Sequence, residues 1–403
     1  MSEPLKQISG WVEDHRVECL DFLRRLIATP SPSGGEGEAA KLVAEEMARL
    51  GFTSTRVDRL HNAMGELGGR GGGRVLLLNG HLDHVPPGDM SEPYSGRVMD
   101  GSRFGVEGQV VYGRGACDMK AALAAMVLAG GALTGCGLEL RGGLRVAAVA
   151  QEEVGGAGTK ATVVESQFLG DVVVVGEATN MGLALGHRGS LKVDVFVHGR
   201  SCHASAPQRG VNALYKAAEL VRRIRDELAP GLPEHPLYGK ATLVATQVET
   251  SPKAANVVPE KCRVTLDCRN HPGFTADDLY HALKDLVSRL AEEDPEFRAT
   301  VIPSSLVNER RFSGFYTDPG EHPVVGELEE AIAEAYGRPR RGLWTFATDG
   351  RIYSRLGIPV VGFGPGEERF AHTEMDHVKV QDFLDTVKVY AWMACKVCGL
   401  AGE

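Results

Sequence analysis

Acidic and imidazole side chains follow five short apolar segments of this 403-residue chain. These side chains belong to His81 and Asp83, Asp118, Glu152 and Glu153, Glu177, and His372. In open α/β sheets, ligands bind beyond the carboxyl ends of the strands, so residues that follow different strands meet at one edge. With one ligand from each segment, the set is two imidazoles and three carboxylates, which suit divalent ions, zinc first, with cobalt or manganese as alternatives. The pattern therefore predicts a metal centre.

The number of candidate ligands favours two ions rather than one. Five protein ligands exceed what one tetrahedral zinc ion accepts. If one carboxylate bridges, the set serves two ions about 3.5–4 Å apart, with a water molecule between them. Glu152 and Glu153 are neighbours, and we expect one to coordinate while the other faces this water as a general base. Two ions would lower the pKa of the water and polarise a substrate carbonyl, which is the chemistry of hydrolysis.

The segments that must position these side chains have the pattern of buried strands. Four of the five are almost continuous apolar runs, which are typical of a mostly parallel sheet covered by helices on both faces, and the fifth, residues 110–112, precedes Asp118. The runs comprise residues 74–79, 144–150, 171–176 and 358–363, and helical patterns at 119–133 and 323–336 alternate with them. We expect an α/β fold with a mostly parallel central sheet and flanking helices.

The middle of the chain has a different pattern. Strand patterns occur at 191–197, 242–248, 263–268 and 298–302, and helical patterns at 212–228 and 276–290. This β-α-β-β-α-β order is that of a ferredoxin-like α+β unit. We therefore expect residues 1–186 and 306–403 to form the two parts of a catalytic α/β domain, with residues 187–305 inserted between them.

Composition excludes several classes of partner. The net charge of −9 provides no basic face for nucleic acid and no polybasic patch for a membrane. The longest apolar runs are far shorter than the ~20 residues of a transmembrane helix. The N-terminus lacks the features of a secretory signal. Eight irregularly spaced cysteines favour reduced thiols, so we expect a cytoplasmic protein.

Five motifs together resemble the aminoacylase/acetylornithine deacetylase/succinyl-diaminopimelate desuccinylase family of dinuclear metallopeptidases. They cover essentially the whole chain in the family's order: Gly80-His-Leu-Asp-His-Val-Pro86, Gly113-Arg-Gly-Ala-Cys-Asp-Met-Lys120, Gln151-Glu-Glu-Val-Gly-Gly156, Gly176-Glu-Ala-Thr179 and Ala371-His-Thr373. The branch that looks most similar is that of the YgeY-type hydrolases. The stretches that carry this similarity are Gly176–Asn180, Ser201–Pro207 and Arg209–Ala213.

The resemblance implies a role for each residue of the centre. His81 and Glu177 would hold one metal ion, Glu153 and His372 the other, and Asp118 would bridge the two. Glu152 would be the general base that activates the bridging water. Asp83 would accept the second ring proton of His81 and so fix its tautomer. A cis peptide between Asp118 and Met119 is also implied.

The inserted domain carries further resemblances, which imply a lid and a dimer contact. His203 matches a histidine that in dimeric members reaches the partner subunit's metal site and stabilises the oxyanion. Asn256 and Arg269 match positions that grip the substrate carboxylate or the tetrahedral centre. We therefore expect a homodimer whose domains close over a small-molecule substrate.

The expected reaction is hydrolysis of an amide bond in a small N-acyl amino acid or related metabolite. A dipeptidase or carboxypeptidase with the same mechanism is the alternative. The segment after His372 reads Thr-Glu-Met-Asp-His, where the family often has Thr-Pro-Asn/Asp-Glu, so the substrate is less defined than the metal chemistry. Two alternative functions are a metal-binding protein without turnover and a thiol hydrolase. The intact Glu152 argues against the first. The second would use Cys117, or Cys202 with His203, and would leave the carboxylates unexplained.

Overall fold

The computed structural model describes residues 1–69, 71–303 and 313–402. Two compact units make up the chain. Unit 1 comprises Met1–Gly186, Tyr316–Gly342 and Thr348–Glu403, and unit 2 comprises His187–Phe315 and Leu343–Ala347. The boundary predicted between residues 305 and 306 lies outside the described residues.

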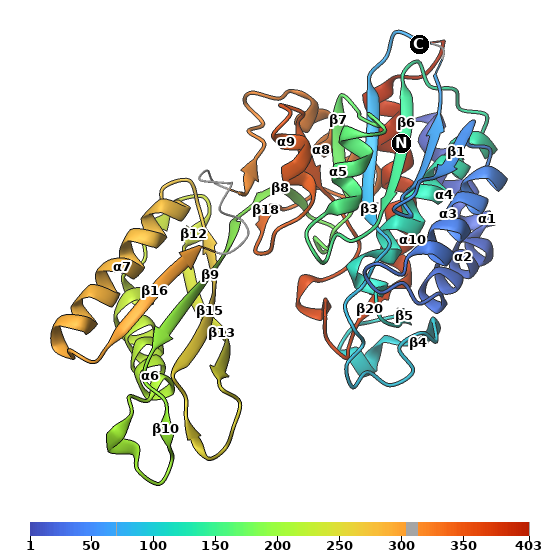
Figure 1. The fold of residues 1–403 in the computed structure, drawn as a ribbon. Coiled ribbons are helices and arrows are strands. Elements are labelled where there is room, and N and C mark those ends of the chain that lie inside the picture. The colour runs from blue at the N-terminus through green and yellow to red at the C-terminus, as the bar shows by residue number, and fades with distance from the viewer. Residues whose placement is uncertain (70, 304–312, 403) are drawn as a thin grey trace. The chain divides into compact units, whose positions relative to one another are not determined.

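A mixed sheet forms the centre of unit 1 (Figure 1). Its strand order is β1 (Ser54–Val57), β2 (Ala63–Leu67), β6 (Gly143–Val149), β3 (Val75–His81), β7 (Val172–Val175), β19 (Val360–Gly362), β8 (Leu183–His187) and β17 (Phe315–Tyr316), with β18 (Arg341–Trp344) also paired to β8. The four predicted apolar runs are β3, β6, β7 and β19, and these strands pair in parallel.

The outer strands correct the prediction of a mostly parallel sheet. β1 pairs antiparallel with β2, β2 with β6, and β8 with β19. Strands β1 and β2 are joined by only five residues, and such a short connection permits antiparallel pairing but no parallel crossover. The parallel character is thus confined to the centre, where helices cover both faces.

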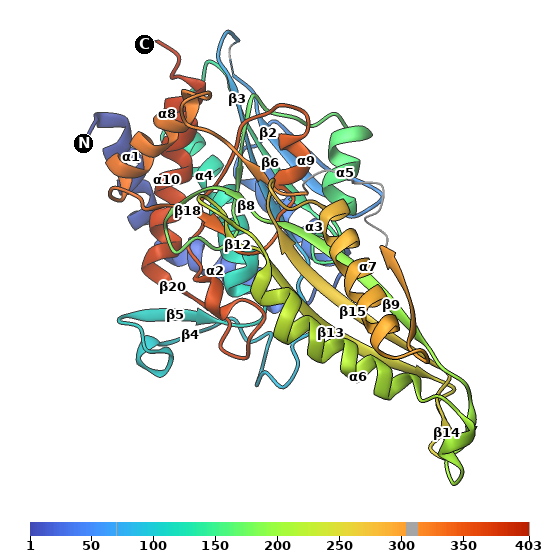
Figure 2. The ribbon, with the colours of Figure 1, turned by 90° about the vertical axis from the view of Figure 1, so that its left-hand side faces the viewer.

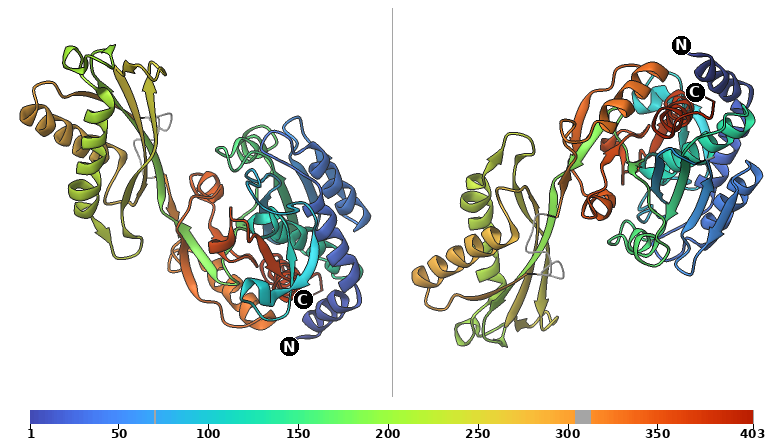
Figure 3. Two further views of the ribbon diagram at one scale, coloured as in Figure 1. Left: turned by 90° about the horizontal axis from the view of Figure 1, so that it is seen from below. Right: turned by 90° about the horizontal axis from the view of Figure 1, so that it is seen from above.

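Helices cover both faces of this sheet (Figure 3). On one face α4 (Ala121–Gly135) and α10 (Val380–Cys398) contact β3 and β6. On the same side, α4 is contacted by α1 (Glu3–Asp14), α2 (Arg16–Ala28) and α3 (Gly37–Arg49), and α10 is contacted by α8 (Val324–Ala335). On the other face α5 (Ala157–Val164) contacts β6, and α9 (Gly350–Ser354) contacts β7 and β19.

One helical stretch of the described chain, Ala116–Gly135, is long and apolar enough to cross a membrane. Its residues 116–133 are all buried inside unit 1, as expected of a core helix. It combines the π-helical turn η2 (Ala116–Lys120) with α4, and its small residues let α10 and the sheet approach closely. The helical pattern predicted at residues 119–133 corresponds to α4, which begins and ends two residues later.

A small three-stranded sheet of β4 (Arg97–Asp100), β5 (Gln109–Tyr112) and β20 (His377–Lys379) also belongs to unit 1. All its pairings are antiparallel, and β5 is the central strand. The short helix η1 (Gly101–Phe104) connects β4 to β5, and η6 (Glu368–Phe370) precedes β20. The sheet therefore joins the segment after residue 112 to the segment before residue 377.

Unit 2 has the predicted β-α-β-β-α-β order. Its main elements are β9 (Gly189–His198), α6 (Ala213–Arg223) with its continuation η4 (Ile224–Leu228), β13 (Thr242–Ser251), β15 (Lys261–Asn270), α7 (Ala276–Glu293) and β16 (Arg298–Pro303). The antiparallel sheet has the order β13-β15-β9-β16. Smaller elements are β10 (Cys202–His203) paired with β14 (Val257–Val258), β11 (Glu234–His235) paired with β12 (Gly239–Lys240), and the turns η3 (Pro207–Arg209) and η5 (Ala229–Gly231).

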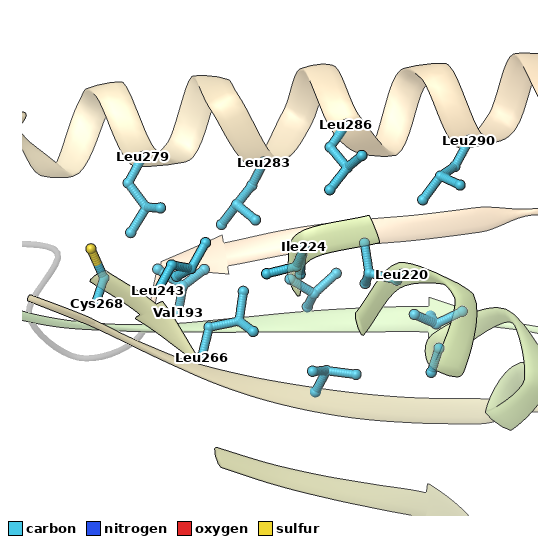
Figure 4. Packing of buried hydrophobic residues seen from close by; sticks show 14 of the residues in the cluster. Val193, Leu220, Ile224, Leu243, Leu266, Cys268, Leu279, Leu283, Leu286 and Leu290 are labelled. Atoms are coloured by element: carbon cyan, nitrogen blue, oxygen red, sulfur yellow. The ribbon is translucent and has the colours of Figure 1, made fainter. Parts of the chain in front are cut away.

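The core of unit 2 follows from the periods of its elements. Alternate residues of β9 and β15 are buried, and α7 presents leucines at positions three or four apart to the same side. Figure 4 shows four of them, Leu279, Leu283, Leu286 and Leu290, pointing toward the strands. Burying each such leucine contributes about 1.5–3 kcal/mol. A capping box between Thr275 and Asp278 sets where α7 begins.

Candidate metal centre

The predicted ligands of unit 1 converge beyond the carboxyl ends of its parallel strands. His81 is the last residue of β3, Asp118 lies in η2 after β5, and the Glu152–Glu153 pair follows β6. Glu177 follows β7, and His372 lies in the segment between β19 and β20. Two groups of potential ligand atoms result, each with its atoms within 4.8 Å of one another: His81 with Glu152 and Glu177, and His81 with Asp118 and Glu153.

His81 lies between two carboxylates at the base of the cluster. Its Nε2 is 2.9 Å from Oδ1 of Asp118 and 3.5 Å from Oε1 of Glu177. All three side chains are at least nine-tenths buried. One imidazole and two carboxylates thus face a common point, which is a donor set that suits a divalent ion.

Asp118 reaches the second histidine with its other oxygen. Its Oδ2 is 3.1 Å from Nε2 of His372, and the same nitrogen is 3.0 Å from Oε1 of Glu153. One carboxylate therefore stands between two imidazole–carboxylate pairs, with one oxygen directed to each. The Asp118–Met119 peptide is cis, as the resemblance implied.

The centre carries a large excess of buried negative charge. Among the described ion pairs, none joins Asp118, Glu152, Glu153 or Glu177 to a lysine or arginine. Burial, and then the nearby Asp118, raise the pKa of Glu177 to about 8. Oε2 of Glu177 is buried without a hydrogen-bond partner. Such an orphaned oxygen among uncompensated carboxylates fits divalent cations, so the residues present match the implied metals.

Glu152 has the environment expected of a general base or acid. Its carboxyl lies in the group with His81 and Glu177. Burial, together with nearby Asp349, raises the pKa of Glu152 well above the usual value. Hydrogen bonds to Asp118 and Glu153 raise the pKa of His372 to about 10. Two neighbouring glutamates thus lie in different surroundings: Glu153 is paired with an imidazole, whereas no ion pair is formed by Glu152 in the described structure.

Asp83 acts on the centre differently from the prediction. Nδ1 of His81 donates to the backbone carbonyl of Asp83 at 2.8 Å, whereas the Asp83 carboxylate is 3.7 Å away. That carboxylate instead accepts the backbone N–H groups of Glu152 and Glu153, at 3.0 and 3.3 Å, and the hydroxyl of Ser33 at 2.6 Å. The backbone carbonyl of Asp83 is therefore nearer to the His81 ring than the Asp83 carboxylate is. Asp83 therefore fixes the tautomer through its backbone and the Glu152 loop through its side chain.

Two further carboxylates hold this loop: Glu36, which the sequence did not single out, and Asp349, which lies in a Thr348-Asp349-Gly350 stretch that resembles a family loop near the substrate. Oε1 of the buried Glu36 accepts the N–H of Gln151 at 3.1 Å. Asp349, also buried, accepts the Thr159 hydroxyl at 2.6 Å and packs on Gly156. A Cβ at Gly156, where φ is +73°, would lie 2.1 Å from Oδ1 of Asp349, so only glycine fits there. Neither carboxylate lies at the end of an apolar run, so the strand pattern gave no signal for them.

The other three predicted residues belong to unit 2. His203 is exposed on β10, and its Nδ1 accepts the hydroxyl of Ser205 at 2.7 Å. The backbone carbonyl of Asn256 accepts the N–H of Ala204 at 2.9 Å, so His203 and Asn256 lie near each other. Arg269 lies near the end of β15, where its Nε donates to Asp267 at 2.9 Å. The structure thus groups His203 with Asn256 but not with Arg269.

The profile of peptidase family M20/M25/M40 matches residues 77–396, which include every predicted metal ligand. The chain belongs to this family. It is therefore a metallohydrolase of the peptidase and amidohydrolase type, and the resemblance drawn from the motifs is confirmed.

Named relatives include both uncharacterised and deacylating proteins. The chain is 29% identical over 412 residues to the uncharacterised protein YgeY of Escherichia coli K12, covering 97% of this chain and 98% of YgeY. It is 30% identical over 395 residues to the succinyl-diaminopimelate desuccinylase of Granulibacter bethesdensis, covering 92% and 96%. The acetylornithine deacetylase of Myxococcus xanthus is 29% identical over 348 residues, covering 84% of each chain.

Solved structures share the fold at lower identity. Human carnosine dipeptidase 1 has a TM-score of 0.80 and 16% identity, covering 98% of this chain and 99% of the dipeptidase. The dipeptidase Dug1p of Saccharomyces cerevisiae has a TM-score of 0.78 and 16% identity, covering 100% of both chains. The mixed central sheet and the separate antiparallel unit are therefore the architecture of this family.

Proposed function

We propose that this protein hydrolyses the amide bond of a small N-acyl amino acid at a centre of two divalent metal ions. The observation that carries the proposal is the Asp118 carboxylate, which stands between two imidazole–carboxylate pairs with Glu152 beside them. Relatives of nearly 30% identity that act as deacylases support an acyl group as the part removed.

The donor set assigns the residues that would hold the ions. His81 and Glu177 would hold one and Glu153 and His372 the other, with Asp118 shared between them. Zinc suits these nitrogen and oxygen donors first, and cobalt or manganese are alternatives. When bound, such ions lower the pKa of water and polarise a carbonyl.

The residues of the chain move the protons. Glu152 lies free of the described ion pairs and beside the ligands, so it can accept the proton of the attacking water. Its raised pKa makes the carboxylate a stronger base, and the carboxylic acid that forms can then pass that proton to the leaving nitrogen. Asp83 and Glu36 accept the backbone N–H groups of residues 151–153, which holds Glu152 in place for both transfers.

A substrate screen tests the reaction class. Metal-free protein reconstituted with zinc, cobalt or manganese is assayed against N-acetyl, N-succinyl and N-carbamoyl amino acids and against dipeptides. We expect metal-dependent release of the free amino acid from at least one N-acyl series. Cleavage of dipeptides alone would support the dipeptidase alternative, and no cleavage of any amide in the presence of bound metal would contradict the proposal.

The geometry of unit 2 supports a homodimer in which one active site uses both copies. Arg269 lies eight residues along β15 from Lys261, a span of roughly 27 Å at ~3.4 Å per residue. The β10–β14 pair with His203 joins the chain beyond the Lys261 end, and Figure 2 shows β12 and β14 at opposite ends of unit 2. One copy therefore cannot bring His203 and Arg269 to the same small substrate. If both act on it, they come from different copies, and the family resemblance assigns His203 to the partner.

Mixed dimers test this arrangement. Glu152→Gln and His203→Ala homodimers are each expected to have very low activity. After unfolding and refolding together, half of the dimers are mixed, and each has one site with both residues intact. We expect about a quarter of the wild-type activity to return. Activity that stays at the level of the separate variants would contradict a contribution from the partner subunit. We also propose a cytoplasmic location, since the eight cysteines form no disulfide in the described structure.

A further inference from the structure

A buried aspartate ties together two of the segments that carry metal ligands. Asp376 lies four residues after His372 and is wholly buried. Its Oδ2 accepts the N–H of Gly115 at 2.7 Å and Nη1 of Arg114 at 3.0 Å, and its Oδ1 accepts the N–H of Cys117 at 2.8 Å. Three donors from one short segment thus converge on a single carboxylate.

These donors immediately precede Asp118. Arg114 to Cys117 form the turn that enters η2, in which Asp118 is the third residue. The carboxylate of Asp376 therefore fixes the position of Asp118 from one side and the position of His372 from the other. The two ligands meet at 3.1 Å, although they are 254 residues apart in the sequence.

The rest of the His372 segment is anchored to the same turn. The Cys117 thiol donates to the carbonyl of Glu367 at 3.2 Å, and Cys117 packs with Ala178, Phe370 and Ala371. The His372 side chain itself is 48% exposed, and its backbone φ is +62°. Packing of the ring therefore does little to place it, and the anchors on either side of His372 determine where its Nε2 points.

We propose that Asp376 is a positioning residue. It sets the affinity for the metal ion that Glu153 and His372 would hold together with Asp118. It does so by holding the Asp118 turn and the His372 segment together before any ion binds. Outer partners that orient metal ligands typically contribute about 10–100-fold to metal affinity. This inference rests on the proposed two-metal function.

The test compares Asp376→Asn with Asp376→Glu and wild type, using zinc competition against a chromophoric chelator. Asparagine keeps the size of the side chain but cannot accept hydrogen bonds with both terminal atoms, whereas glutamate keeps the carboxylate. We expect wild type to bind two zinc ions and Asp376→Asn to bind one of them at least ~10-fold more weakly. Asp376→Glu is expected to recover most of the loss. Glu374→Gln, an exposed carboxylate of the same segment, is the matched control and should bind as wild type.

The outcomes separate this inference from the proposed function. Wild-type protein that binds no zinc contradicts the two-metal centre itself. Two tightly bound ions in both wild type and Asp376→Asn overturn the inference alone. A purely structural role would lower the unfolding temperature of the metal-free variant and leave its zinc affinity unchanged, which also overturns the inference.

A second measurement needs no variant and applies even if Asp376→Asn fails to fold. Amide hydrogen exchange is followed in metal-free wild-type protein at Gly115 and Cys117, the two backbone donors to Asp376. We expect both to be protected before metal is added, because their hydrogen bonds to Asp376 form without the ion. Exchange at the rate of exposed loops, with protection only after zinc addition, would overturn the inference.

Discussion

The Glu152→Gln variant is expected to lose about 10²–10⁴-fold in kcat while it still binds both metal ions. Glutamine has nearly the same size as glutamate but cannot take a proton from water. Because Glu152 lies beside the ligand atoms without a described ion pair of its own, its replacement should not disturb the donors that hold the ions. The measurement is kcat and KM on the substrate found in the screen, with the zinc content of the same sample.

Glu45→Gln serves as the control, since Glu45 is an exposed glutamate of unit 1 on α3. It should leave both kcat and zinc content at the wild-type level. A Glu152→Gln protein that keeps two zinc ions and loses less than tenfold in kcat would remove Glu152 from the mechanism. The KM is expected to change little, because the proton transfer takes place in the transition state rather than in substrate binding.

Asp118→Ala is expected to reduce turnover to the level of the assay blank, because Asp118 is the carboxylate common to both imidazole–carboxylate pairs. Chelation should do the same to wild type. The difference lies in recovery: zinc, cobalt or manganese should restore the chelated wild type but not the variant. Metal content after dialysis and activity after re-addition are measured on both proteins.

Stability provides an independent signal for the same centre. Ligands that bind only the folded state raise the free energy of unfolding, by about 2.7 kcal/mol at a concentration of 100 times Kd. Zinc should therefore raise the unfolding temperature of wild type and change that of Asp118→Ala much less. Equal zinc-induced shifts in both proteins would show that the ion binds elsewhere, and activity that survives complete chelation would exclude the metal mechanism.

The parts that could be predicted from the sequence are those with a periodic or local signal. Apolar runs located β3, β6, β7 and β19, and polar residues after those strands located the metal centre, because strand ends share one edge of a parallel sheet. The antiparallel outer strands have weaker patterns. β2, for example, contains Gly65 and Glu66, so it did not stand out as an apolar run.

The supporting contacts of the centre have no such signal. Asp376 bonds to Gly115 from 261 residues away, and Glu36 bonds to Gln151 from 115 residues away. Which carboxylate receives which backbone N–H depends on how the loops pack, and no spacing in the sequence records that. The same holds for Asp83, whose carbonyl rather than its carboxylate meets the His81 ring.

Anomalous diffraction from a crystal of the protein grown with zinc tests the central claim most directly. We expect two zinc peaks about 3.5–4 Å apart, with one oxygen of Asp118 on each and Glu152 facing them without coordinating. A single peak, or a pair of peaks at which Asp118 supplies no oxygen, would contradict the two-metal centre.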